Sequence, residues 1–162
     1  MSHVNQNQED PTISELAARQ KIWLVDSKGL ITSQRGDSLE HHKQPYAHEL
    51  STTAPSTLLQ AVQLIQPTAL FGLSTVGQSF TKDVCKEMVR NAKAVDEKAK
   101  PLIFALSNPT SKAECTAQQA YEWCDGEVVY ASGSPMDEVF HLQLLLLFRV
   151  FNHMSDYLLR LR

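Results

Sequence analysis

The sequence predicts an α/β fold, a partial doubly wound parallel sheet, because short apolar runs alternate with segments of helical periodicity. Four runs have the length and composition of buried strands, at residues 22–26, 68–71, 102–106 and 128–131. Segments with apolar side chains at helical spacing lie between them. The resulting β-α-β-α-β-α-β order favours parallel strands joined by right-handed crossovers.

Length and composition limit the classes of protein to which the chain can belong. With 162 residues, 43% of them hydrophobic, it can bury one core and is expected to form one domain. A formal net charge of −3, without clustered Lys and Arg, argues against nucleic acid or an anionic membrane as partner. Cys85, Cys115 and Cys124 match no Cys-x-x-Cys spacing, which predicts buried free thiols in a reducing compartment.

The first third of the chain is expected to hold one helix end, one strand and a long loop. Residues 14–20 have the composition of a helix end, and the strand at residues 22–26 ends in the carboxylate of Asp26. A turn that contains glycine follows at residues 27–29, and the polar segment 33–54 is predicted to be mainly loop.

Two helices are expected around the strand at residues 68–71. The first is capped by Ser56 and ends before Pro67. The second extends to about Ala94 and follows a loop, residues 72–77, that contains two glycines.

The strand at residues 102–106 is expected to lead into a ligand-binding loop. Ser111, followed three residues later by Glu114, matches a capping box and predicts a helix that begins near Ala113. Residues 107–110 would then lie at the carboxyl end of a buried strand, where open α/β sheets bind ligands.

Asp26 lies where dinucleotide-binding sheets place the carboxylate that meets the adenosine ribose. Such folds carry a glycine-rich turn about twenty residues earlier, and no glycine precedes Gly29. Two interpretations stay open: Asp26 is a solvated strand end, or the first strand and its turn belong to a larger domain outside this sequence.

The loop at residues 72–77 falls one residue short of a nucleotide-triphosphate-binding loop. Gln78 stands where that loop requires a lysine, which argues against triphosphatase activity. The two glycines either allow a ligand to approach the backbone or serve a plain turn.

The two ends of the chain differ in composition from residues 13–139. Residues 1–12 are polar and lack the apolar core of a secretory signal, so a cytoplasmic location is expected. Residues 140–162 have apolar side chains at spacings of three and four, which predicts an added C-terminal helix too short in apolar length to span a bilayer. That helix either packs on a sheet or core, or supports self-association or partner binding.

Several segments, taken together and in order, closely resemble malic enzyme over residues 13–139. They are residues 21–31, 46–49, 66–68, 80–81, 103–116 and 131–135. The resemblance implies the later part of a Rossmann-like NAD(P)-binding domain. It also implies an enzyme that decarboxylates malate oxidatively to pyruvate with NAD or NADP and a divalent metal.

The resemblance implies cofactor-binding roles near the first strand. Asp26 would be the adenosine-ribose carboxylate, and Ser27 and Lys28 resemble the NADP-linked members. Lys43 matches a position where those members place a lysine for the 2′-phosphate. A phosphate beside Asp26 needs such a cation to offset repulsion.

The resemblance also implies roles at the carboxyl edge of the sheet. The loop residues expected to pass beneath the dinucleotide are Ser74, Thr75, Val76 and Gly77. Ser107 would lie beside the nicotinamide, and the Asn108 amide would donate to a malate oxygen.

The catalytic Tyr and Lys, the malate-binding Arg and the acidic Mg²⁺ or Mn²⁺ ligands of the family match no position here. They are expected upstream, so no catalytic or metal-binding residue is assigned. The Gly-Gln-Gly-Asn-Asn stretch expected after Pro135 is replaced by the apolar segment 140–162. We therefore expect a truncated NAD(P)-binding portion, inactive alone, with NADP and malate as ligands. The alternatives are an interaction module that pairs with full-length malic enzyme or with itself, or a product without function.

Overall fold

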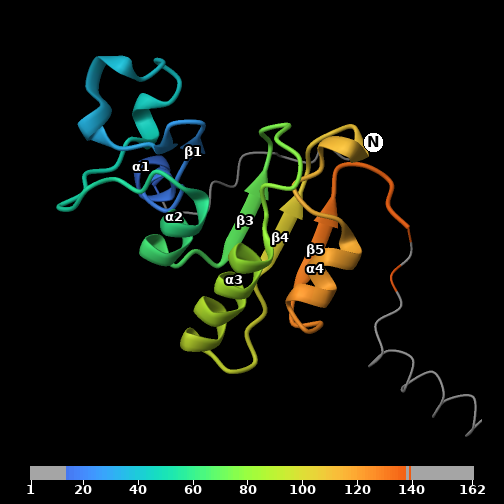
Figure 1. The fold of residues 1–162 in the computed structure, drawn as a ribbon. Helices are drawn as coiled ribbons and strands as arrows, with labels where there is room; N and C mark the ends of the chain where they lie inside the picture. The colour runs from blue at the N-terminus through green and yellow to red at the C-terminus, as the bar shows by residue number, and fades with distance from the viewer. Residues whose placement is uncertain (1–13, 138, 140–162) are drawn as a thin grey trace, which may run out of the picture. The chain divides into compact units, whose positions relative to one another are not determined.

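The computed structural model describes residues 14–137 and 139, and these fall into two units (Figure 1). The first unit extends to Thr57 and the second begins at Leu58. Residues 1–12 and 140–162 lie outside the described residues, so the predicted C-terminal helix stays a prediction. Among the described residues, no helix is long and apolar enough to cross a bilayer.

The first unit contains one short helix and a tight hairpin. Helix α1 (Glu15–Arg19) begins after Ser14, whose side chain accepts a hydrogen bond from the Ala17 amide at 3.2 Å. Strand β1 (Val25–Asp26) pairs antiparallel with β2 (Gly29–Leu30). Gly29 has a φ of +100°, and a Cβ there would lie 2.4 Å from a backbone oxygen of the same unit. Glycine is therefore required at this turn.

The remainder of the first unit is loop with two short 3-10 turns. These are η1 (Ser33–Ser38) and η2 (Gln44–Tyr46). An isolated parallel bridge joins Thr32 to His48. The side chain of His48 stacks on Trp23 with 3.8 Å between ring centroids. The predicted loop is therefore ordered by contacts with the segment around β1.

The prediction that residues 22–26 form a fourth parallel strand is wrong. Only Val25 and Asp26 of this run form a strand, and their partner is the antiparallel β2. The neighbouring carbonyls are also bonded within this unit. Leu24 accepts from the Ile31 amide at 2.8 Å, and Ile22 accepts from Nε2 of His48 at 2.8 Å. The turn after Asp26 supplies local backbone partners, which an apolar run alone could not reveal.

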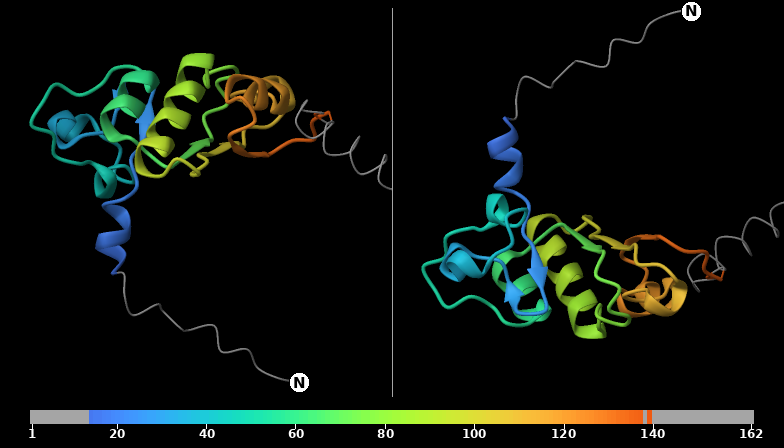
Figure 2. Two further views of the ribbon diagram at one scale, coloured as in Figure 1. Left: turned by 90° about the horizontal axis from the view of Figure 1, so that it is seen from below. Right: turned by 90° about the horizontal axis from the view of Figure 1, so that it is seen from above.

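The second unit confirms the predicted parallel sheet for three strands. Strands β3 (Ala69–Gly72), β4 (Leu102–Ala105) and β5 (Val129–Ser132) are parallel and adjacent in that order. Helices α3 (Lys82–Val95) and α4 (Ala117–Trp123) connect them and cover one face of the sheet (Figures 1 and 2). This is the α/β arrangement of a partial Rossmann-like domain.

Helix α2 (Leu58–Ile65) precedes β3 and ends before Pro67, as predicted. It packs beside α3, and the Asn91 side-chain amide of α3 donates to the Val62 carbonyl at 3.1 Å. Helix α3 is capped by Thr81, whose side chain accepts from the Val84 amide at 3.4 Å. Both helices therefore join the core on the same side of the strands as α4.

The core lies between β4 and the helices. Its buried members are Val62, Phe80, Val84, Cys85, Met88, Ile103, Ala105, Cys115, Ala120, Cys124 and Val128. The opposite sheet face is more open. Phe71 on that face is 54% exposed and its ring meets Phe104 edge-on, with 5.1 Å between centroids. The alternation along each strand thus directs one set of side chains to the core and the other away from it.

The helix predicted to begin near Ala113 starts later and uses a different cap. Residues Thr110–Lys112 form a single 3-10 turn, η3. Helix α4 is capped by Thr116, whose side chain accepts from the Gln119 amide at 3.1 Å, while Oε1 of Gln119 accepts from the Thr116 amide at 2.8 Å. The predicted box of Ser111 and Glu114 is wrong, because Glu114 is buried and bonds to Ser107 instead.

Candidate functional site

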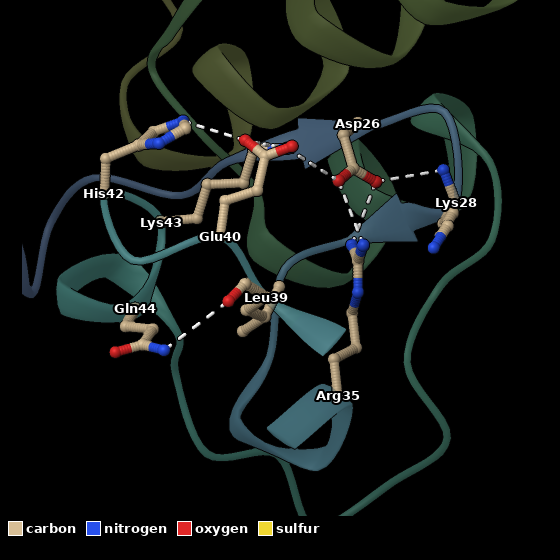
Figure 3. A network of polar contacts seen from close by, with 8 residues as sticks. All are labelled: Asp26, Lys28, Arg35, Leu39, Glu40, His42, Lys43 and Gln44. Carbon is tan, nitrogen blue, oxygen red and sulfur yellow. Dashed lines mark hydrogen bonds and ion pairs between the residues drawn. The ribbon is translucent and has the colours of Figure 1, made fainter. Parts of the chain in front are cut away.

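Asp26 is the centre of a polar cluster in the first unit (Figure 3). Arg35 donates to both of its oxygens, from Nη1 to Oδ1 at 2.9 Å and from Nη2 to Oδ2 at 3.0 Å. Nζ of Lys43 lies 3.3 Å from Oδ2, and the Lys28 amide donates to Oδ1 at 2.9 Å. Each carboxylate oxygen therefore accepts two hydrogen bonds.

The local chain geometry explains how these donors reach Asp26. The hairpin turn directly after β1 returns the Lys28 amide to the carboxylate, a common role for Asp at turns. The η1 turn then brings Arg35 back over β1. Lys43 comes from the next loop and is also 3.5 Å from Glu40.

The electrostatics of the cluster favour an ionised Asp26. The hydrogen bond from Arg35 is the largest cause that lowers the pKa of Asp26, from its usual 3.8 to about 2, against a smaller opposing effect of burial. The Lys28 amide and Lys43 lower that pKa further. Asp26, Glu40, Arg35 and Lys43 together carry no net charge at neutral pH. The exposed Lys28 next to Asp26 adds one positive charge, so the surroundings of this carboxylate are not repulsive to an anion.

Arg35 is the member of this cluster that the sequence did not predict. It lies nine residues after Asp26, in a polar segment without periodicity, and no pattern in the sequence marks it as a partner. Ser27 and Lys28, which were predicted, are exposed at the turn beside Asp26. The structure therefore brings Asp26, Lys28 and Lys43 together and adds one arginine.

The second unit gathers a different set of predicted residues at the carboxyl edge of its sheet. Ser74, Thr75 and Val76 are exposed in the loop after β3, and Gly77 is half-buried. The amide of Thr75 donates to Oγ of Ser107, in the loop after β4, at 2.9 Å. The loops after β3 and β4 are therefore directly bonded to each other.

Ser107 and Asn108 differ sharply in exposure although they are neighbours. Ser107 is buried, whereas Asn108 is exposed at the edge of the sheet. Oγ of Ser134, after β5, donates to the Ser107 carbonyl at 3.3 Å. The amide of Asn108 is thus the group of this pair that a ligand at the sheet edge can reach.

The three cysteines lie in the second unit. All three are buried free thiols, as predicted. A hydrogen bond with Cys115 is the main cause that raises the pKa of Cys85 to about 12, and burial acts in the same direction. Within residues 14–137 and 139, no group of three or more His, Cys, Asp or Glu side chains could hold a metal ion. No step that requires Mg²⁺ or Mn²⁺ can therefore be derived from these residues.

Comparison with known proteins decides the family. The family model described as "Malic enzyme, NAD binding domain" matches residues 1–143. This chain belongs to that family. The resemblance seen in the sequence is therefore confirmed.

The malic enzyme domain has well-matched relatives. It is 55% identical over 123 residues to NADP-dependent malic enzyme 2 of Arabidopsis thaliana. These 123 residues are 76% of this chain and 20% of that protein. It is 47% identical over 131 residues to the NADP-dependent malic enzyme of Dictyostelium discoideum. These 131 residues are 81% of this chain and 23% of that protein. The chain thus spans about a fifth of the length of these relatives.

Proposed function

We propose that this malic enzyme domain binds NADP, in preference to NAD, with Asp26, Arg35 and Lys43 next to the adenosine 2′-phosphate. The occupancy of the Asp26 oxygens supports this choice. A carboxylate has about four acceptor positions, and four donors already use them. A ribose 2′-hydroxyl, which in NAD-binding folds donates to this carboxylate, would have to displace one of these donors.

The charges in the cluster also favour a phosphate. An unpaired carboxylate repels each unit of negative charge on a phosphate by about 4 kcal/mol at 4 Å when the effective dielectric constant is about 20. Arg35 and Lys43 offset that effect, because their two positive charges balance the negative charges of Asp26 and of Glu40, which lies 3.5 Å from Lys43. The exposed Lys28 adds a further positive charge beside Asp26. Arg35 and Lys43 retain hydrogen-bond donors beyond those given to Asp26, and arginine suits phosphate recognition through its planar fork.

Calorimetric titration of the full 162-residue chain with 2′,5′-ADP and 5′-AMP tests the proposal. These two ligands differ only in the 2′-phosphate. We expect 2′,5′-ADP to bind at least about tenfold more tightly, the size of one charge-assisted hydrogen bond. Lys43→Gln should remove most of this preference. Lys86→Gln, which removes an equal charge from an exposed position on α3, should leave it unchanged. Equal affinities for the two ligands would contradict the proposal.

The edge of the sheet in the second unit is proposed to face the nicotinamide half of the cofactor and malate. The loop residues Ser74–Val76 are exposed at this edge, and the Asn108 amide can donate to a malate oxygen. The proposed role of this chain is binding and orientation. Oxidative decarboxylation of malate also needs proton transfer and polarisation of the carbonyl, for which no residue of this chain is assigned.

The Asn108 proposal has its own test. In saturation-transfer NMR with NADPH present, malate signals should respond to the wild-type chain and lose most of that response with Asn108→Ala. Asn5→Ala, in the polar segment 1–12, is the matched control. An unchanged response with Asn108→Ala would contradict the assignment. Self-association and pairing with full-length malic enzyme depend on residues 140–162 and stay predictions.

A further inference from the structure

A carboxylate is buried at the carboxyl edge of the sheet in the second unit. Glu114 is 0% exposed and accepts hydrogen bonds from the hydroxyl of Ser107 and, at 3.4 Å, from the Ser107 amide. Gly72, the last residue of β3, leaves room for the Glu114 side chain, because a Cβ at Gly72 would lie 2.2 Å from Cδ of Glu114. A buried acidic group requires partners of this kind, so its position depends on Ser107.

The one donor of the Ser107 hydroxyl is used inside the protein. It has one proton, which it gives to Glu114, and it accepts from the Thr75 amide at 2.9 Å. Ser107 is itself buried. No proton of this hydroxyl is left for a cofactor, so Ser107 cannot donate to a ligand while it donates to Glu114.

Glu114 and its neighbour also fix the far end of the loop that follows β3. The Ala113 carbonyl accepts from the Gln78 amide at 3.0 Å, and the Glu114 carbonyl accepts from the Phe80 amide at 3.0 Å. The other end of this loop is held at Thr75 through Ser107. The loop between Thr75 and Phe80 is therefore hydrogen-bonded at both ends to the segment 107–114.

We propose that Glu114 is a positioning residue for the nicotinamide-binding edge. Its carboxylate orients the Ser107 hydroxyl, and that hydroxyl places the Thr75 amide and the backbone from which Asn108 projects. Ser107 then supports the loops and does not donate to the ligand. This inference rests on the proposed function of the same edge, and it adds a residue that the sequence suggested only as part of a helix cap.

Comparison of two ligands separates positioning from general stability. NADPH contains the nicotinamide half, whereas 2′,5′-ADP contains only the adenosine half. With the full chain, Glu114→Gln and Ser107→Ala should each weaken NADPH binding by about tenfold, the effect of one charge-assisted hydrogen bond. Both variants should leave 2′,5′-ADP binding within about twofold. The control Glu97→Gln, at an exposed position, should change neither.

Amide hydrogen exchange at Thr75 gives a readout that needs no ligand. In Glu114→Gln the acceptor of the Ser107 hydroxyl loses its charge, and an NH2 group replaces the oxygen that accepts from the Ser107 amide. Exchange at Thr75 should therefore quicken while exchange in the core strand β4 stays unchanged. Ser107→Ala removes the acceptor directly and should quicken exchange at Thr75 at least as much.

The outcomes distinguish this inference from the proposed function. If the wild-type chain binds neither ligand, the proposed function fails. If the wild type binds both and the two variants bind NADPH as the wild type does, the positioning role is wrong. Equal weakening of both ligands, or quickened exchange throughout β4, would show a general loss of stability and would also overturn the positioning role.

Discussion

Replacing Asp26 by asparagine should remove a pH-dependent part of the stability of the first unit. The substitution keeps the shape of the side chain and removes its charge. It leaves Arg35, whose side chain is only 15% exposed, without its carboxylate partner. The loss of one member of such a pair is costly because the other charge stays partly buried.

The magnitude follows from the pKa of Asp26. The drop from 3.8 to about 2 corresponds to about 2 kcal/mol, since each tenfold change in the acid dissociation constant is worth about 1.4 kcal/mol. The side chain of Asp26 is 20% exposed, so solvent screening reduces the expected stabilisation to about 1–2 kcal/mol.

The sign of the pH dependence is fixed by the direction of that change. A carboxyl whose pKa is lower in the folded state stabilises the fold fully above the unfolded pKa, here 3.8. The contribution is lost as the pH falls from about 4 toward 2. Wild type should therefore exceed Asp26→Asn in stability by about 1–2 kcal/mol at pH 7 and pH 5, and the gap should shrink steadily below pH 4.

Trp23 provides a local assay because it stacks on His48 within the first unit. In a Trp123→Phe background it is the single tryptophan of the chain, so urea unfolding followed by its fluorescence reports this unit. Asp37→Asn removes an exposed carboxylate from the same unit and is the matched control. A gap that is the same at pH 7 and pH 3, or an equal gap for Asp37→Asn, would refute the reasoning.

Three further predictions concern the second unit, and urea unfolding followed by circular dichroism tests each. Gly72→Ala should destabilise it by about 1–3 kcal/mol, because the new Cβ overlaps Glu114; wild-type stability would mean that the carboxylate moves freely. Ile103→Ala should lower the free energy of unfolding by about 2–5 kcal/mol, and Phe71→Ala by under about 2 kcal/mol, because Ile103 is 0% exposed and Phe71 is 54% exposed. Equal losses for the two variants would place Phe71 in a core. Thr116→Ala should cost about 1 kcal/mol as the cap of α4 is lost, and no loss would show that Gln119 suffices.

The three parallel strands could be predicted because each is a short apolar run next to a segment of helical periodicity. Strands covered by helices need short apolar runs, and those that became β3, β4 and β5 are each followed or preceded by a segment of helical periodicity. The run at residues 22–26 meets the same condition and folds differently. Its partner is the chain immediately after it, and pairing with a neighbour in sequence has no signature in apolar content.

The sequence could predict that a capping box begins the helix after β4, but not which residues form it. Both Ser111 with Glu114 and Thr116 with Gln119 have the spacing of a capping box. The second pair forms the cap because the Glu114 side chain is turned into the interior toward Ser107. Which of two equivalent local patterns forms is decided by burial, a property of the folded chain.

The sequence by itself determined the family and the α/β class, because these depend on residue types in a fixed order along the chain. It also singled out Asp26 and Lys43, which the structure places in contact. Only the tertiary structure decided that Arg35 completes the cluster around Asp26 and that Ser107 and Glu114 form a buried pair. Hydrogen bonds across loops join residues whose separation follows no period. They depend on how the backbone turns back on itself, and that is fixed only when the whole unit has folded.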